Sequence, residues 1–236
     1  ITGSIVMWTS MGTDTSVTIT DLSLVEGKTY YLSVRATDML NNVSSVVTSD
    51  GVKLDITDPA TGSVVVGTDA HLHWAYDTTS VTATWSGFSD GGSGIKEYEV
   101  MLRDSTSTAD EVGWTVVSDA VTHIFAGLDL DNNSEYYIKV RATDKVGNIS
   151  SVVNSALFQV DSEKPTVTTV FETVEGVNEN LHWFGPDDEI IHHWKGSDNG
   201  SILQYHFAIG TAEETDDVIA TTAVGLDTTD TTLASG

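Results

Sequence analysis

The chain has 236 residues, with 35 Asp and Glu against 10 Lys and Arg, a formal net charge of −25 and no cysteine. This charge excludes nucleic-acid binding through phosphate neutralisation, and the missing cysteine excludes disulfide frameworks and thiolate metal sites. No apolar run approaches the roughly 20 residues that span a bilayer, so we expect no membrane insertion in this segment. Thr and Val, both β-branched, supply 33 and 28 residues and favour β-sheet.

The chain repeats itself. The sequence YYLSVRATD at 30–38 returns as YYIKVRATD at 136–144, and HLHW at 71–74 returns as NLHW at 180–183. A unit of about 107 residues therefore repeats. We predict three domains: 1–59 is the C-terminal part of one repeat, 60–165 a complete repeat and 166–236 the N-terminal part of a third. We also expect neighbouring sequence, or a further copy of the chain, to complete the partial repeats.

Seven short strands are predicted in the complete repeat, because alternating runs are bounded by Gly, Asp and Asn. In chain order they cover 63–67, 81–85, 95–102, 113–118, 121–126, 136–142 and 152–160. An extra segment, 72–74, precedes the second strand and is either an added edge strand or an insertion on a sheet face. Helical periodicity is absent. The sequence therefore predicts an all-β fold of tandem antiparallel β-sandwich domains.

Residues around the sixth strand resemble a known family. Leu130, followed six residues later by Tyr136-x-Ile138-x-Val140-x-Ala142, is similar to the tyrosine corner of fibronectin type III domains. The phrases YYLSVRATD and SDGVKLDITDP resemble tandem fibronectin type III and bacterial Ig-like repeats of large extracellular surface or adhesin-like proteins. The resemblance implies a location outside the cell or on its surface, and places Trp85 and Tyr98 in the core.

Calcium is the cofactor that the acidic residues favour, because hard cations take oxygen ligands. Asp129, Asp131, Asn133 and Glu135 alternate in the loop before the sixth strand, where the alternative is a solvated turn. A second candidate lies at the junctions between repeats, through Asp55, Asp58, Asp161 and Glu163. The recurring pairs Asp38/Asn42 and Asp144/Asn148 are interpreted as turn formers. His71 and His73 share a strand face and offer a weaker metal site, since no third ligand follows.

Other candidate sites are aromatic residues and sequons. Trp8 and Trp114 are equivalent in the repeat, lie near a sheet edge and could bind glycans by stacking, although packing is the commoner role of Trp. Four Asn-x-Ser sequons are candidate glycosylation sites, at Asn42, Asn132, Asn148 and Asn199.

Catalysis finds no support, because no nucleophile, phosphate-binding or zinc-protease motif occurs. Our first hypothesis is a structural or adhesive segment of a long secreted or cell-surface repeat protein, acting as a stalk or filament spacer. Its partners would be neighbouring repeats or further copies in a filament. The alternatives are an adhesin module that binds glycans or cell-surface proteins, and an accessory region of a secreted hydrolase.

Overall fold

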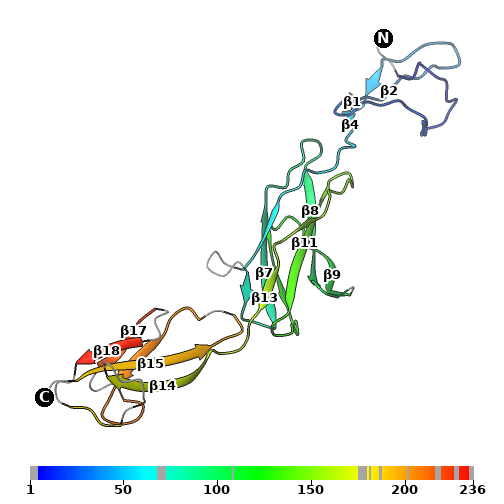
Figure 1. Cartoon of the computed structure of the whole chain (residues 1–236). Helices are drawn as coiled ribbons and strands as arrows, with labels where there is room; N and C mark the ends of the chain where they lie inside the picture. Colours follow the sequence, from blue (N-terminus) through cyan, green and yellow to red (C-terminus); the bar gives the residue numbers. More distant parts are fainter. Residues whose placement is uncertain are drawn as a thin grey trace.

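The computed structural model describes residues 5–67, 73–107, 109–174, 180, 182–185, 188–200, 202–215, 219–225 and 229–233. Regular structure in these residues consists of β-strands, and none of them forms a helix that could cross a membrane. The strands gather in three units that follow one another from the N-terminus to the C-terminus (Figure 1).

The central unit is a sandwich of two sheets. The first sheet has the order β10-β7-β5, and the second has the order β6-β13-β11-β8-β9 with β12 paired to β11. Every pairing is antiparallel except that of β6 with β13. The predicted fold class, an all-β antiparallel sandwich of the fibronectin type III/Ig-like type, is confirmed. The strands of this unit are β5 (Ser63–Val66), β6 (Trp74–Ala75), β7 (Ser80–Ser86), β8 (Ile95–Asp104), β9 (Asp110–Val116), β10 (Thr122–Ala126), β11 (Glu135–Asp144), β12 (Val153–Asn154) and β13 (Phe158–Val160).

The core of the central unit lies between the two sheets. Because successive side chains of a strand point to opposite faces, alternate residues of β7 and β11 are buried. Trp85 is 2% exposed and meets the Tyr98 ring edge-on at 5.6 Å between centroids. The core positions predicted for Trp85 and Tyr98 are therefore correct.

A buried tyrosine hydroxyl fixes the turn before β11. The Asp131 N–H donates to Tyr136 Oη at 2.9 Å, and the same contact recurs in the first unit from the Val25 N–H to Tyr30 Oη at 2.7 Å. This is the tyrosine corner that the spacing of Leu130 and Tyr136 predicts.

Two details go beyond the sequence pattern. Of the extra segment 72–74, Leu72 lies outside the described residues, while Trp74 and Ala75 form edge strand β6 and pair in parallel with β13. The edge-strand alternative thus holds for the described part. The predicted seventh strand is split into β12 and β13, because Ser155 Oγ accepts the Ile138 N–H at 2.9 Å and interrupts the ladder.

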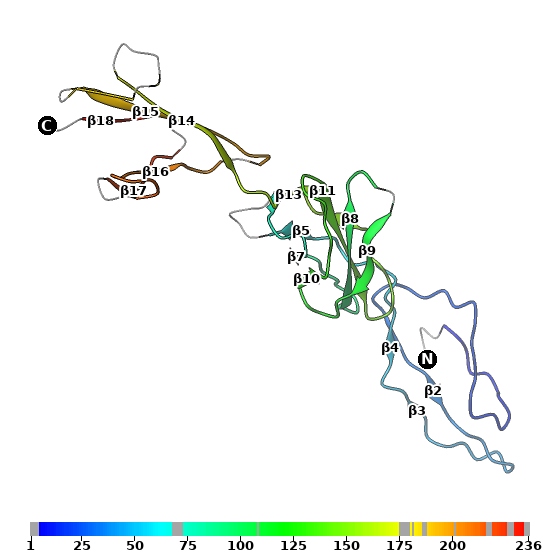
Figure 2. The same ribbon diagram turned by 90° about the horizontal axis from the view of Figure 1, so that it is seen from below.

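Each of the two outer units contains two small sheets of two or three strands. In the first unit no side chain of residues 5–54 is buried, whereas the matching strands of the central unit are covered by β5 and β7. In the third unit, Trp194 is 8% exposed and lies 6.1 Å from the Tyr205 ring, as the repeat predicts from Trp85 and Tyr98. The division of the chain at 59 and 165 remains a prediction. The outer strands are β1 (Thr29–Tyr30), β2 (Ser33–Val34), β3 (Val47–Thr48), β4 (Val52–Lys53), β14 (Thr166–Val174), β15 (Glu189–Ser197), β16 (His206–Ile209), β17 (Ile219–Ala223) and β18 (Thr229–Leu233) (Figure 2).

Candidate functional site

Three carboxylates converge where the first unit joins the central unit. Asp55 comes from the linker after β4, Asp90 from the loop between β7 and β8, and Asp144 from the end of β11. One carboxylate oxygen from each lies within 4.8 Å of the others. Asp55 is 9% exposed and Asp144 is fully buried, so two of the three are removed from water. Among the described residues this is the only such group of three acidic or histidine side chains.

Backbone N–H groups hold each carboxylate in place. Asp144 Oδ1 accepts the N–H groups of Val146, Gly147 and Asn148 at 2.9, 2.6 and 2.8 Å, which confirms its turn-forming role. Asp90 Oδ2 accepts the Gly94 N–H at 2.6 Å. Asp55 Oδ2 accepts the Ser93 N–H. These hydrogen bonds fix the position of each of the three carboxylates.

The surroundings of Asp55 and Asp144 favour the charged form of these two carboxyls. Burial raises the pKa of Asp144, but hydrogen bonds from Asn148, Gly147 and Val146 outweigh it and hold the pKa below its usual range. The Ser93 hydroxyl lies beside Asp55 and, with the N–H groups of Thr57 and Ser93, lowers the pKa of that carboxyl against the effects of burial and of Asp144. Two like charges thus stand close together in their ionised form.

The second junction repeats part of this arrangement. Asp161 and Asp198 are the repeat equivalents of Asp55 and Asp90, and Gly200 is that of Gly92. A Cβ atom at Gly92 would clash with the Asp55 carboxylate, and one at Gly200 would clash with that of Asp161. The junctions predicted through Asp55 and Asp161 are therefore built alike, while the other two residues of that prediction, Asp58 and Glu163, are exposed.

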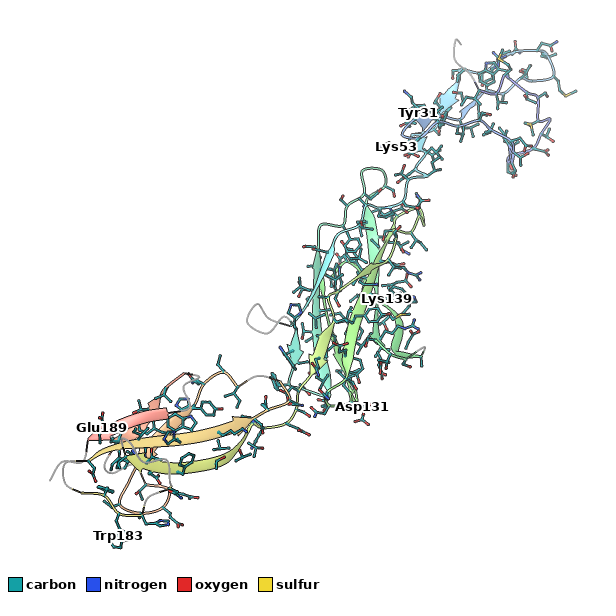
Figure 3. The ribbon with its side chains drawn as sticks, in the orientation of Figure 1. Tyr31, Lys53, Asp131, Lys139, Trp183 and Glu189 are labelled. Atoms are coloured by element: carbon teal, nitrogen blue, oxygen red, sulfur yellow. The ribbon has the colours of Figure 1, made fainter. Side chains whose placement is uncertain are left out.

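The loop before β11 does not form a comparable group. Asp129, Asp131, Asn133 and Glu135 are all exposed, and their three carboxylates do not converge. Asp131 lies at the opposite end of the central unit from the Asp55 junction, next to the third unit (Figure 3). Calcium at this loop remains a prediction.

The described histidines do not form a metal site either. His71 lies outside the described residues, and His73 Nδ1 is 3.3 Å from the Leu157 carbonyl oxygen. In the third unit His193 Nε2 lies 2.9 Å from Thr173 Oγ1, and its ring stacks on Phe171. The described histidines join no group of three metal ligands.

Each tryptophan predicted to bind glycans is covered on one face by an arginine. The Arg141 guanidinium lies 4.4 Å from the Trp114 ring centroid, and that of Arg35 lies 4.5 Å from the Trp8 ring centroid. Arg141 is in turn fixed by Glu99, with Nε to Oε2 at 2.7 Å and Nη2 to Oε1 at 3.1 Å. The repeat of this contact indicates a structural layer on the sheet, and glycan binding there remains a prediction.

The four sequon asparagines lie outside the strands, and the side-chain amides of three of them are engaged in hydrogen bonds. Asn148 Nδ2 donates to Asp144 Oδ2 at 2.7 Å, and Asn42 Nδ2 donates to Asp38 Oδ2 at 2.9 Å. Asn132 Oδ1 accepts the Ser162 N–H at 2.9 Å. Asn199 is exposed, and Ser201 of its sequon lies outside the described residues. Glycosylation at these four sites remains a prediction.

Comparison with known proteins links the chain to two glucanases. No family model matches it. It is 34% identical over 161 residues to exoglucanase B of Cellulomonas fimi, which is 66% of this chain and 13% of that protein. It is 33% identical over 162 residues to endoglucanase B of Cellulomonas fimi, which is 66% of this chain and 14% of that protein. The chain therefore spans a small part of the curated relatives it matches.

Among solved structures, the chain matches that of the FN1–FN3 domains of chicken CNTN1. The identity is 16% and the TM-score 0.36, with 91% of this chain and 69% of that chain covered. The fold assignment rests on the strand pairing within the central unit.

Proposed function

We propose that the chain is a non-catalytic segment of tandem β-sandwich repeats in a longer extracellular enzyme that degrades glucans, where it spaces other domains. The observation that supports this is the similarity to two glucanases, of which the matched segment makes up only 13% and 14%. Of our sequence-based hypotheses, this favours the accessory region of a secreted hydrolase over an adhesive filament.

The charges of the acidic cluster support a role without catalysis. Glycoside hydrolysis needs a carboxylic acid whose pKa is raised so that it can donate a proton. Asp55 and Asp144 have lowered pKa values and receive hydrogen bonds from neighbouring N–H groups, which is the opposite arrangement. The geometry suits holding charge in place and does not suit proton transfer to a leaving group.

The junctions support a spacing role. The linkers at 55–59 and 161–165 are short and end in Pro59 and Pro165, whose fixed backbone angle limits the swing between units. Pro59 is also buried against the central unit. A net charge of −25 keeps a chain of such units soluble and prevents close association between molecules.

A second candidate function is glucan binding by exposed aromatic side chains. Trp183 is 89% exposed and its neighbour Phe184 is 61% exposed in the third unit (Figure 3). Flat aromatic rings of this kind stack on sugar rings. This role would accompany the spacing role in the same enzyme.

Two measurements test the proposal. The chain alone, incubated with insoluble cellulose and with carboxymethylcellulose, should release no reducing sugar; hydrolysis that survives purification to homogeneity would contradict it. The reading frame that encodes the chain should also encode a glucanase catalytic domain, and a surface anchor without such a domain would favour the adhesive stalk instead. Retention on cellulose that is lost in Trp183→Ala and kept in Tyr76→Ala, which removes an equally exposed ring from the central unit, would support the second candidate.

A further inference from the structure

We propose that the central unit binds one sugar residue of a glucan chain in a polar hollow at the end next to the third unit. The hollow has a volume of about 310 Å³, at the small end of the range for ligand pockets, which suits a single sugar ring. It lies beside the turn that contains Asp131, which is labelled in Figure 3. The choice of a glucan rests on the proposed function, whereas the site itself rests on the geometry of the hollow. The lining residues are Ser105, Thr106, Asn133, Ser134, Glu135 and Gln159.

The hollow offers polar groups that the rest of the described protein leaves unpaired. Among the described residues, the hydroxyls of Ser105 and Ser134 and the carboxylate of Glu135 take part in no hydrogen bond or ion pair. Gln159 uses its amide N–H groups, which leaves its carbonyl oxygen as an acceptor. A sugar hydroxyl donates one hydrogen bond and accepts others, so this mixture of hydroxyls with carboxylate and amide oxygens matches it. These groups bind water until a ligand replaces it.

The walls of the hollow are held in place by hydrogen bonds that do not involve a ligand. On one side, Asp104 Oδ1 accepts the Thr106 N–H at 2.6 Å and the Thr106 hydroxyl at 2.8 Å. On the other side, Gln159 Nε2 donates to the Asn133 carbonyl oxygen at 3.3 Å. Side chains that are already ordered lose less conformational entropy on binding, so a hollow of this size can hold a sugar residue with few contacts.

An exposed tryptophan stands beside the hollow on the same face of the sheet. Trp74 of β6 pairs with Gln159 of β13, which in turn pairs with Glu135 of β11. Paired residues on neighbouring strands, about 4.8 Å apart, point to the same face, so the three side chains form a row across the outer face. Trp74 is 37% exposed. A sugar ring has an apolar face and a polar edge, and the row offers an aromatic ring next to polar groups.

The first unit shows that the fold does not require this set of side chains. Thr29 pairs with Lys53 in the first unit as Glu135 pairs with Gln159 in the central unit, so the two strands meet in the same register. The side chains nevertheless differ. The first unit has Gly27, Lys28, Thr29 and Lys53 where the central unit has Asn133, Ser134, Glu135 and Gln159. The polar hollow is therefore a property of the central unit and is not imposed by the repeat.

The test is calorimetric titration of the whole 236-residue chain with cellohexaose, in EDTA so that calcium at the loop before β11 does not contribute. Saturable binding is expected. Glu135→Gln should weaken it about tenfold, because a charged hydrogen-bond acceptor is lost. Gln159→Lys, which introduces the residue of the first unit, should weaken it by a similar factor. Trp74→Ala should also weaken it about tenfold, and Trp74→Phe, which keeps an aromatic face, should bind more tightly than Trp74→Ala.

The matched control is Lys53→Gln, the reverse exchange at the equivalent position of the first unit, which should leave cellohexaose affinity unchanged. Thermal unfolding without sugar shows that each variant is folded. Absence of saturable binding at millimolar cellohexaose would overturn the proposal, and so would equal affinity in the unmodified chain, Glu135→Gln and Gln159→Lys. Binding that is lost in Trp183→Ala but kept in Gln159→Lys would place the sugar in the third unit and overturn this site.

The proposed function and this site fail on different results. The proposed function is refuted if the reading frame encodes no glucanase catalytic domain, whatever the chain binds. A chain that is encoded beside such a domain but binds no cellohexaose would refute this site alone. Saturable binding of mannohexaose without binding of cellohexaose would overturn the assignment of a glucan as the ligand.

Discussion

Single carboxylates serve this protein mainly as hydrogen-bond acceptors in turns. Asp77, in the turn before β7, accepts the Ser80 hydroxyl at 2.7 Å, the Thr79 hydroxyl at 2.6 Å and the Thr79 N–H at 2.7 Å. These bonds lower the pKa of Asp77 from its ordinary value of 3.8 to about 2. A short acidic side chain with nearby Ser and Thr thus orders a loop without a large buried area.

Asp77 should make the stability of the protein depend on acid pH. Its pKa is lower in the folded than in the unfolded state, so its contribution is complete above the unfolded value near 3.8 and is lost as pH falls through about 2. Asp77→Asn should therefore lower the unfolding temperature at pH 7, and the difference from the unmodified chain should shrink between pH 4 and pH 2. Thermal unfolding of both proteins at several pH values measures this difference. If the difference in unfolding temperature stays constant down to pH 2, the ionised Asp77 carboxylate is not what stabilises the turn.

The acidic cluster shows how far sequence alone could lead at the residue scale. Asp55 could be singled out because it recurs as Asp161 in a linker, and Asp144 because its turn recurs at Asp38. Asp90 and Ser93 carry no local motif, and only the pairing of β8 with β11 brings their loop to Asp144. The recurrence of Asp90 as Asp198 was the one available signal. By contrast, the alternating acids at 129–135 form a regular pattern in sequence but stay apart in space, because the turn directs them to solvent.

At the scale of elements, alternation along strands carries the fold. In β11 every second residue from Tyr136 to Asp144 is buried, and the residues between them lie on the outer face. The outer face holds Lys139 over the Tyr137 ring and Arg141 over that of Trp114. The strands of the complete repeat could be predicted because this period of two is explicit, and the third unit follows from the repeat. The parallel pairing of β6 with β13 could not be predicted from the sequence, because a strand of two residues carries no pattern that sets its register.

Substitutions on the two faces of β11 should differ sharply in effect. Ile138 is fully buried in the core, so Ile138→Ala should lower the free energy of unfolding by about 2–5 kcal/mol through lost burial and a cavity. Lys139→Ala, its neighbour on the outer face, should change it by about 0.5 kcal/mol or less. Denaturant unfolding of both variants gives the comparison. Equal losses would mean that β11 does not separate a core face from a solvent face in solution.

For the whole molecule, stability is concentrated in the central unit. The buried hydrophobic cluster runs from Val64 to Val160 and takes no member from residues 5–54 of the first unit. The first unit leaves Val34, Val47 and Val52 exposed at 55%, 70% and 73%. Cooperative unfolding depends on a shared core, so the units are expected to differ in how they unfold.

The segment 60–165 should therefore fold by itself, which tests the predicted domain division. Its core is complete within the segment, so it should unfold cooperatively, with an unfolding temperature close to that of the main transition of the 236-residue chain in EDTA. The segment 1–59 alone should show no cooperative transition, because none of its described residues from 5 to 54 has a buried side chain. Calorimetry and the dispersion of amide resonances measure both. If 60–165 were unfolded alone while the whole chain unfolds cooperatively, the units would share their stability and the boundaries at 59 and 165 would have no thermodynamic meaning.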